Sequence, residues 1–172
     1  SKQNYIGKNI KGTKIKIVKA KNNTYGELLI KGKNLCSGYL NNHINSEKFH
    51  KGWFKTGDLV KKIKNKIILI GRADNQINIG GNKIYPEMVE KQIEKIPYIS
   101  TVLCFPEIDK FYGSRMSLAI EMPKINFNTK KITDKILNIF NKKPDYLKPK
   151  NIIFKKIKTT INGKKIRNIK YI

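Results

Sequence analysis

The stretch from residue 52 to residue 90 constrains the fold more than any other part of this 172-residue chain. It begins with short β-type segments separated by glycine turns, and it ends with a helical pattern that opens at Pro86. Proline suits the first turn of a helix, and Glu87 and Glu90 favour the positive end of the helix dipole. We therefore expect a change from β structure to mixed α and β structure within this stretch.

The residues before Gly71 are typical of a small, twisted antiparallel β structure. Lysine alternates with aliphatic residues over 14–19, and a similar segment at 27–31 follows turn residues at 21–26. This period-two alternation indicates a β-hairpin. We expect two further strands at 58–63 and 66–70, and a short polar helix at 46–50.

The residues after Asp74 predict a sheet with packed helices. A β-ribbon is expected at 76–84, where Gly80 and Gly81 interrupt it. Residues at helical spacing mark one face of each of two helices. The first helix starts at Pro86, with a face of Met88, Val89, Gln92, Ile93 and Ile96, and the second covers 129–141, with Ile132, Ile136, Leu137, Ile139 and Phe140. Strands are expected at 100–105, 116–121 and 151–156.

The predicted fold class is therefore α+β, with a small antiparallel β-barrel-like part over residues 1–72 and an α+β domain over 76–172. Length alone permits one ordinary domain or two small ones. The sequence has no internal repeat and no long linker, so we expect a tight hinge at residues 73–75.

The net charge of +25 leaves open a stand-alone basic module that binds nucleic acid or an acidic partner. Only Arg72, Arg115 and Arg167 are arginine, and the lysines are scattered along nearly every segment. Specific readers of bases and phosphates favour the planar arginine fork. We therefore expect no specific nucleic-acid partner, and we keep this function as the alternative.

The cysteine and histidine residues predict free thiols and no metal site. Cys36 and Cys104 are isolated, and His43 and His50 do not complete a ligand pattern. No apolar run reaches the roughly 20 residues that span a bilayer, and residues 1–4 lack the apolar core of a signal peptide. We expect a cytoplasmic protein.

Candidate site residues gather in the central stretch. Asp58 follows Thr56 and Gly57, and its carboxylate can accept two hydrogen bonds from a vicinal diol, although an aspartate that caps a turn has the same pattern. Arg72 offers bidentate geometry to a phosphate or carboxylate, or else a surface ion pair.

In order and spacing, five blocks resemble the distal motifs of adenylate-forming enzymes, namely acyl-CoA synthetases, aryl-CoA ligases and peptide-synthetase adenylation domains. The resemblance runs from Ile6 to Arg167 and implies that the chain is only the C-terminal portion of such an enzyme. Residues 1–72 would end its large N-terminal domain, and 76–172 would be its mobile C-terminal domain. The blocks are 26–40, 52–59, 71–74, 80–90 and 160–167.

The resemblance implies roles for four residues near the domain boundary. Asp58, in the Thr-Gly-Asp motif with Thr56, would hold the ATP ribose. Arg72 would contact the nucleotide. Asp74 would be the hinge about which the C-terminal domain rotates between the two half-reactions.

In the C-terminal part, the resemblance implies that Gly80 and Gly81 line a pantetheine tunnel. Without that context, the glycine pair is a bulge or tight turn. Lys164, in an Asn-Gly-Lys loop, would contact the carboxylate and α-phosphate during adenylation, although Lys165 is adjacent. Peptide-synthetase domains differ around the glycine pair, which favours an acyl-CoA synthetase, but a carrier-protein thiol would use the same tunnel.

The implied reaction activates a carboxylic acid with ATP and Mg²⁺ to acyl-AMP and then transfers the acyl group to CoA or a carrier-protein phosphopantetheine. The phosphate loop, the adenine-binding segment and the acid pocket of the family do not occur in these residues. We therefore expect the fragment alone to be inactive, to hold no ligand tightly and to need the N-terminal domain. A split enzyme with a separate N-terminal chain remains a further alternative.

Overall fold

The computed structural model describes residues 5–19, 24–40, 42–123 and 128–167. The chain divides into two compact units, residues 1–74 and 75–172, and each is described by itself. Both units combine sheets with few helices, which confirms the predicted α+β class. The assignment of 1–72 to a larger N-terminal domain, with a hinge at 73–75, stays a prediction.

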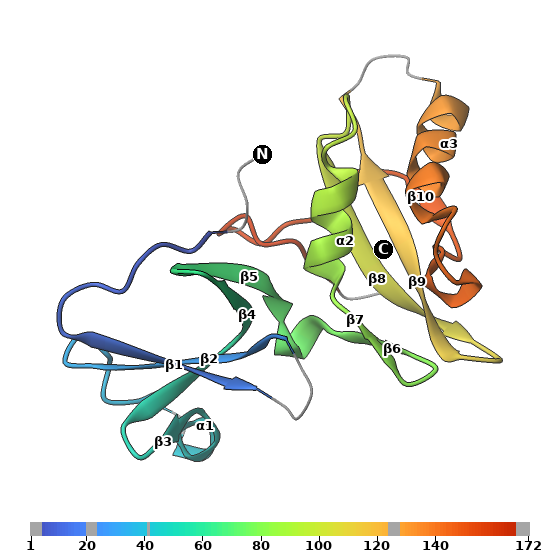
Figure 1. Cartoon of the computed structure of the whole chain (residues 1–172). Coiled ribbons are helices and arrows are strands. Elements are labelled where there is room, and N and C mark those ends of the chain that lie inside the picture. Colours follow the sequence, from blue (N-terminus) through green and yellow to red (C-terminus); the bar gives the residue numbers. More distant parts are fainter. Residues whose placement is uncertain (1–4, 20–23, 41, 124–127, 168–172) are drawn as a thin grey trace. The chain divides into compact units, whose positions relative to one another are not determined.

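The first unit is a curled, antiparallel five-stranded sheet (Figure 1). Strands β1, β2, β4 and β3 follow in that order, and β5 pairs with β4. A small core of Leu28, Val60 and Ile67 packs on one face of this sheet, because alternate residues of each strand point to the same side. The elements are β1 (Thr13–Lys19), β2 (Gly26–Gly32), α1 (Asn42–Lys48), β3 (Phe49–His50), β4 (Trp53–Ile63) and β5 (Lys66–Arg72).

Two expectations for the first unit were wrong in their bounds. The helix expected at 46–50 ends at Lys48, and His50 belongs to a strand that pairs with Trp53. Strand β4 begins at Trp53, five residues before the expected start, because Gly57 interrupts the pairing with β2 without ending the strand. The expected turn at 21–26 lies partly outside the described residues.

The second unit has a three-stranded sheet of order β10-β9-β8 and a β6-β7 hairpin (Figure 1). Strand β9 pairs antiparallel with β8 and parallel with β10. A 3-10 helix, Ala73–Asn75, connects the units along the chain. The elements are β6 (Ile77–Ile79), β7 (Asn82–Ile84), α2 (Pro86–Ile93), β8 (Thr101–Asp109), β9 (Gly113–Glu121), α3 (Thr129–Phe140), the 3-10 helix η2 (Asp145–Leu147) and β10 (Ile152–Phe154).

The sheet of the second unit is buried on both faces. Helices α2 and α3 pack on the face that carries Val102, Cys104 and Leu118. On the opposite face, Leu103 and Phe105 pack with Ile157 of the C-terminal segment (residues 157–167). Such two-sided burial explains why β8 is a nearly continuous apolar run.

The buried face of α2 differs from the predicted one. Met88 is half exposed and Gln92 is exposed, whereas Pro86, Glu90 and Ile93 are buried. In α3 the expected face is confirmed at Ile132, Ile136 and Phe140, while Leu137 is partly exposed. Helix α2 is turned so that a carboxylate, rather than a methionine, faces the sheet.

Candidate functional site

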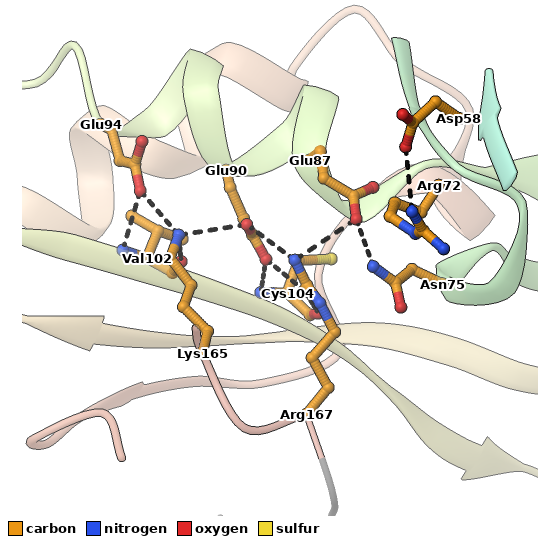
Figure 2. A network of polar contacts seen from close by, with 10 residues as sticks. All are labelled: Asp58, Arg72, Asn75, Glu87, Glu90, Glu94, Val102, Cys104, Lys165 and Arg167. Atoms are coloured by element: carbon orange, nitrogen blue, oxygen red, sulfur yellow. Dashed lines mark hydrogen bonds and ion pairs between the residues drawn. The ribbon is translucent and has the colours of Figure 1, made fainter. Parts of the chain in front are cut away.

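Arg72 lies between two carboxylates at the end of β5 in the first unit. The strand register places it directly opposite Asp58 of β4. Its Nη1 donates to Asp58 Oδ1 (3.1 Å) and to the carbonyl of Thr56 (3.2 Å), and its Nη2 donates to Asp74 Oδ2 (2.9 Å). Figure 2 shows the Asp58–Arg72 pair. The structure thus brings together four of the predicted site residues.

The Thr-Gly-Asp segment has a fixed backbone. The Thr56 hydroxyl donates to the carbonyl of Leu28 (2.8 Å) and accepts from the Asp58 amide (3.0 Å). Gly57 has a φ of +75°, and a Cβ there would lie 2.9 Å from Arg72 Nη2. Glycine is favoured at this position by its backbone angle, and an added Cβ would require the guanidinium to shift.

The carboxylate of Asp58 in this cluster can still accept a hydrogen bond from a ligand. The hydrogen bond to Asp74 raises the pKa of Arg72, partial burial opposes the rise, and the charge of Asp58 adds to it. Arg72 occupies Oδ1 of Asp58, and none of the described residues donates to Oδ2. Both side chains remain partly exposed, so the free carboxylate oxygen can accept a hydroxyl from solvent or from a ligand.

Gly80 and Gly81 form the turn of the β6-β7 hairpin. Their φ values are +53° and +84°, and Ile79 pairs with Asn82 around them. Two positive φ angles are what a two-residue type I′ turn requires. The Gly80 amide donates to the carbonyl of Tyr112 (3.2 Å). This geometry explains both glycines structurally, and their role in a tunnel stays a proposal.

Lys164 lies at the end of a tight turn in the C-terminal segment. The Thr160 amide donates to the Lys164 carbonyl (2.8 Å), and the Lys164 amide donates to Thr160 Oγ1 (3.1 Å). Gly163 provides the positive φ of +72°. The Lys164 side chain is exposed, and no ion pair or hydrogen bond in the described part of the chain joins it to another residue or to the Gly80–Gly81 turn.

Sequence reasoning missed a network of charges in the second unit. Glu87, Glu90 and Glu94, which we call the carboxylate row, lie along α2 and its C-terminus and face Lys165 and Arg167 (Figure 2). Their spacing of three and four residues, in a chain with only 12 acidic residues, is the sequence feature that could have indicated this network. From the sequence alone, Glu90 is expected only to favour the positive end of the helix dipole.

Lys165 is enclosed by three acceptors. Its Nζ donates to Glu90 Oε2 (3.1 Å), to Glu94 Oε1 (2.9 Å) and to the carbonyl of Val102 (2.6 Å). An ammonium has three protons to donate, so this side chain is fully occupied.

Arg167 forms a fork with Glu90. Its Nη1 contacts Oε1, and its Nη2 lies 3.1 Å from Oε2. Nη1 also donates to the carbonyl of Cys104 (3.0 Å), and Nη2 lies 3.5 Å from Glu87 Oε1. The amide nitrogen of the Asn75 side chain donates to the same Glu87 oxygen. The network therefore extends from the C-terminal segment to the first residue of the second unit.

The same side chains satisfy the free edge of strand β8. The Cys104 amide donates to Glu90 Oε1 (2.8 Å), and the Val102 amide lies 3.4 Å from Glu94 Oε1. Lys165 and Arg167 bind the carbonyls of these two residues. At these two residues the edge of β8 offers no unpaired backbone groups to another strand.

Burial shapes the electrostatics of this network. Burial alone lowers the pKa of Arg167, but its hydrogen bond and attraction to Glu90, with a smaller contribution from Glu87, outweigh that effect and raise it overall. Burial raises the pKa of the Cys104 thiol, and the charge of Glu90 adds to the rise. Arg167 is therefore charged and Cys104 is a neutral thiol at physiological pH.

Two further findings concern metals and membranes. Over the described ranges, no group of three or more histidine, cysteine, aspartate or glutamate residues is placed to hold a metal ion. None of the helices in those ranges is both long enough and apolar enough to cross a bilayer.

No protein-family model matches the chain. Curated relatives are similar to it: an acyl-CoA synthetase of Alternaria alternata is 35% identical over 134 residues, which are 75% of this chain and 24% of the relative. A 2-succinylbenzoate–CoA ligase of Enterococcus faecalis is 37% identical over 90 residues, which are 52% of this chain and 19% of the relative.

Solved structures share the fold. An o-succinylbenzoate CoA synthetase of Bacillus subtilis, in complex with its acyl-adenylate intermediate, superposes with a TM-score of 0.83 at 24% identity. The match covers 96% of this chain and 35% of that structure. The chain spans about a quarter of the acyl-CoA synthetase that it matches. The relatives that the chain matches are therefore acyl-CoA synthetases and CoA ligases, and the chain corresponds to a portion of such enzymes, consistent with the C-terminal one.

Proposed function

We propose that the full-length protein is an AMP-forming ligase that activates a carboxylic acid and transfers it to a thiol. In the first step the carboxylate oxygen bonds to the α-phosphorus of ATP, and pyrophosphate leaves. In the second step a thiolate attacks the acyl carbon and AMP leaves. The thiol is CoA or the phosphopantetheine of a carrier protein, and Mg²⁺ accompanies the ATP.

The observation that carries this proposal is the pairing of Asp58 with Arg72 across β4 and β5, in a chain whose relatives are CoA ligases. A free carboxylate oxygen beside a guanidinium suits a ligand that carries both a diol and a phosphate. We assign the ribose to Asp58, with Thr56 fixing its backbone, and the phosphate side to Arg72.

The remaining assignments follow the same proposal. The exposed ammonium of Lys164 would stabilise the charge that develops between carboxylate and α-phosphate. Asp74 would be the hinge residue, and Gly80 and Gly81 would line the path of the thiol. We place the reaction in the cytoplasm, where free thiols such as Cys36 stay reduced.

The test is ATP–pyrophosphate exchange by the full-length protein with a panel of carboxylic acids. We expect exchange with at least one acid, and a loss of about 100-fold or more in Lys164→Ala, the size usual for one transition-state donor. Lys142→Ala, which removes another exposed lysine of the second unit, is the matched control and should keep full exchange. Exchange with no acid, or equal exchange in both variants, would contradict the proposal.

A further inference from the structure

Two adjacent lysines, Lys164 and Lys165, end the turn of the C-terminal segment, and they have opposite surroundings. The backbone there is extended: Thr159 and Lys165 form an antiparallel bridge, and the Ile166 amide donates to the carbonyl of Lys158 (3.0 Å). Successive side chains of an extended strand point to opposite sides. If Lys165 faces α2, Lys164 must face away from it.

Two side chains of the C-terminal segment lie on the side that faces α2. Lys165 and Arg167 are two residues apart and both bind Glu90, which is 3% exposed. A buried carboxylate is destabilising unless it is paired, and removing one partner leaves an uncompensated charge. Shifting the segment by one residue would place Lys164 and Ile166 against the carboxylate row, and an isoleucine cannot replace the guanidinium of Arg167. The network therefore specifies one register.

We propose that Glu90 is a positioning residue: by binding Lys165 and Arg167, it fixes the register of residues 164–167 and directs the Lys164 ammonium outward. This inference rests on the proposed function only in giving Lys164 a role in adenylation. Glu94 shares the contact with Lys165 but does not bind Arg167, so its contribution to the register is smaller.

The competing explanation is that the network only caps the edge of β8. Val102 and Cys104 do bind these side chains through their backbone groups. A cap of this kind would also hold Lys165, but it would act through stability, and therefore on both half-reactions, without directing Lys164. A test must therefore measure Lys164 and Lys165 separately.

The first experiment measures acetylation rates of each lysine in the 172-residue chain by limiting acetic anhydride and mass spectrometry. We expect Lys164 to react at least about tenfold faster than Lys165, because the ammonium of Lys165 is held by charged hydrogen bonds. In Glu90→Gln the ratio should fall to within about threefold, while Glu47→Gln, at an exposed site of the first unit, should leave it unchanged.

Equal reactivity of the two lysines in the wild-type chain would overturn the proposal. So would an unchanged ratio in a Glu90→Gln variant with wild-type circular dichroism. If Glu90→Gln does not fold, Arg167→Lys removes the fork but keeps the charge, and it should still lower the ratio.

The second experiment compares the two half-reactions in the full-length protein. Glu90→Gln should reduce pyrophosphate exchange by about tenfold or more and leave thioester formation from supplied acyl-AMP within about threefold, because only the first step uses Lys164. An equal loss in both would indicate a structural role and overturn the proposal. If Lys164→Ala left exchange intact while Lys165 stayed protected, the proposed function would fail and the assigned register would stand.

Discussion

The two units hold their charged residues in different ways. In the first unit, Arg72 is 42% exposed and bridges Asp58 and Asp74 at a strand end. In the second unit, the Glu90 side chain is 5% exposed, and Arg167, Lys165 and a backbone amide saturate it. The Asp58 carboxylate retains acceptor capacity, whereas the Glu90 carboxylate has none left. We infer that the exposed cluster binds a ligand and that the buried one sets backbone position.

This difference also separates stability from function. A buried ion pair is costly to break because the remaining charge is desolvated. An exposed pair contributes little to stability, because water and salt screen it. Removal of one member should therefore lower stability mainly in the buried cluster and function mainly in the exposed cluster. The following substitutions test that contrast.

The largest effect on stability is expected for Glu90→Ala. It leaves Lys165 and Arg167 half-buried without their shared carboxylate and should lower the free energy of unfolding by about 3 kcal/mol. Urea unfolding followed by circular dichroism measures this change. The control, Glu47→Ala, removes an exposed carboxylate and should stay within about 0.5 kcal/mol of wild type. Equal effects would remove the distinction between the clusters.

Gly57→Ala should have the next largest effect. Its positive φ costs a residue with a Cβ about 1–2 kcal/mol, and that Cβ would also meet the Arg72 guanidinium. Gly12→Ala is the matched control, since Gly12 has a φ of +85° with nothing within 4 Å of the added Cβ. Denaturant unfolding should show a greater loss for Gly57→Ala. If the two losses are the same, Arg72 does not restrict this turn.

The Cys104 thiol predicts a pH dependence confined to the second unit. Its folded pKa is raised, so its contribution is fully present below the ordinary thiol pKa and is lost as pH rises above it. Stability should fall above about pH 8.5, approaching about 1.4 kcal/mol per pH unit. Unfolding curves of Cys104→Ala should lack this slope, whereas those of Cys36→Ala, which removes an exposed thiol, should keep it. A slope retained without Cys104 would assign it to other groups.

The smallest effect on stability is expected for Arg72→Met. Removal of a partly exposed pair should change the free energy of unfolding by less than about 1 kcal/mol. In the full-length protein the same variant should lose pyrophosphate exchange, because the phosphate contact is lost. A change in stability as large as that of Glu90→Ala would show that Arg72 is structural rather than ligand-binding.

Period-two and helical patterns were enough to predict many of the elements, because the strands of the first unit and helix α3 each bury one face. The α3 residues Ile132, Ile136 and Phe140 are an example. The orientation of α2 was not predictable in this way. Glu90 is buried because Arg167, 77 positions along the chain, binds it, and a pairing at that distance leaves no local signal.

The site residues show the same difference between local patterns and pairing over a long sequence distance. Asp58 and Arg72 were found because their motifs are local and because β4 and β5 form a hairpin that brings them together. Lys164 and Lys165 are indistinguishable by composition, and only the contacts of Lys165 with α2 separate them. Sequence spacing predicts local pairs, whereas the folded structure is needed to identify the positioning network.

The most direct measurement is the mass of the native protein in its source cells, detected with an antibody against this chain. If the chain is part of an acid-activating ligase, the antibody will detect a species several-fold heavier than 19.9 kDa, as expected from the 24% of the relative's length that it covers. A native species near 19.9 kDa would contradict a single-chain ligase containing both the Asp58–Arg72 cluster and Lys164.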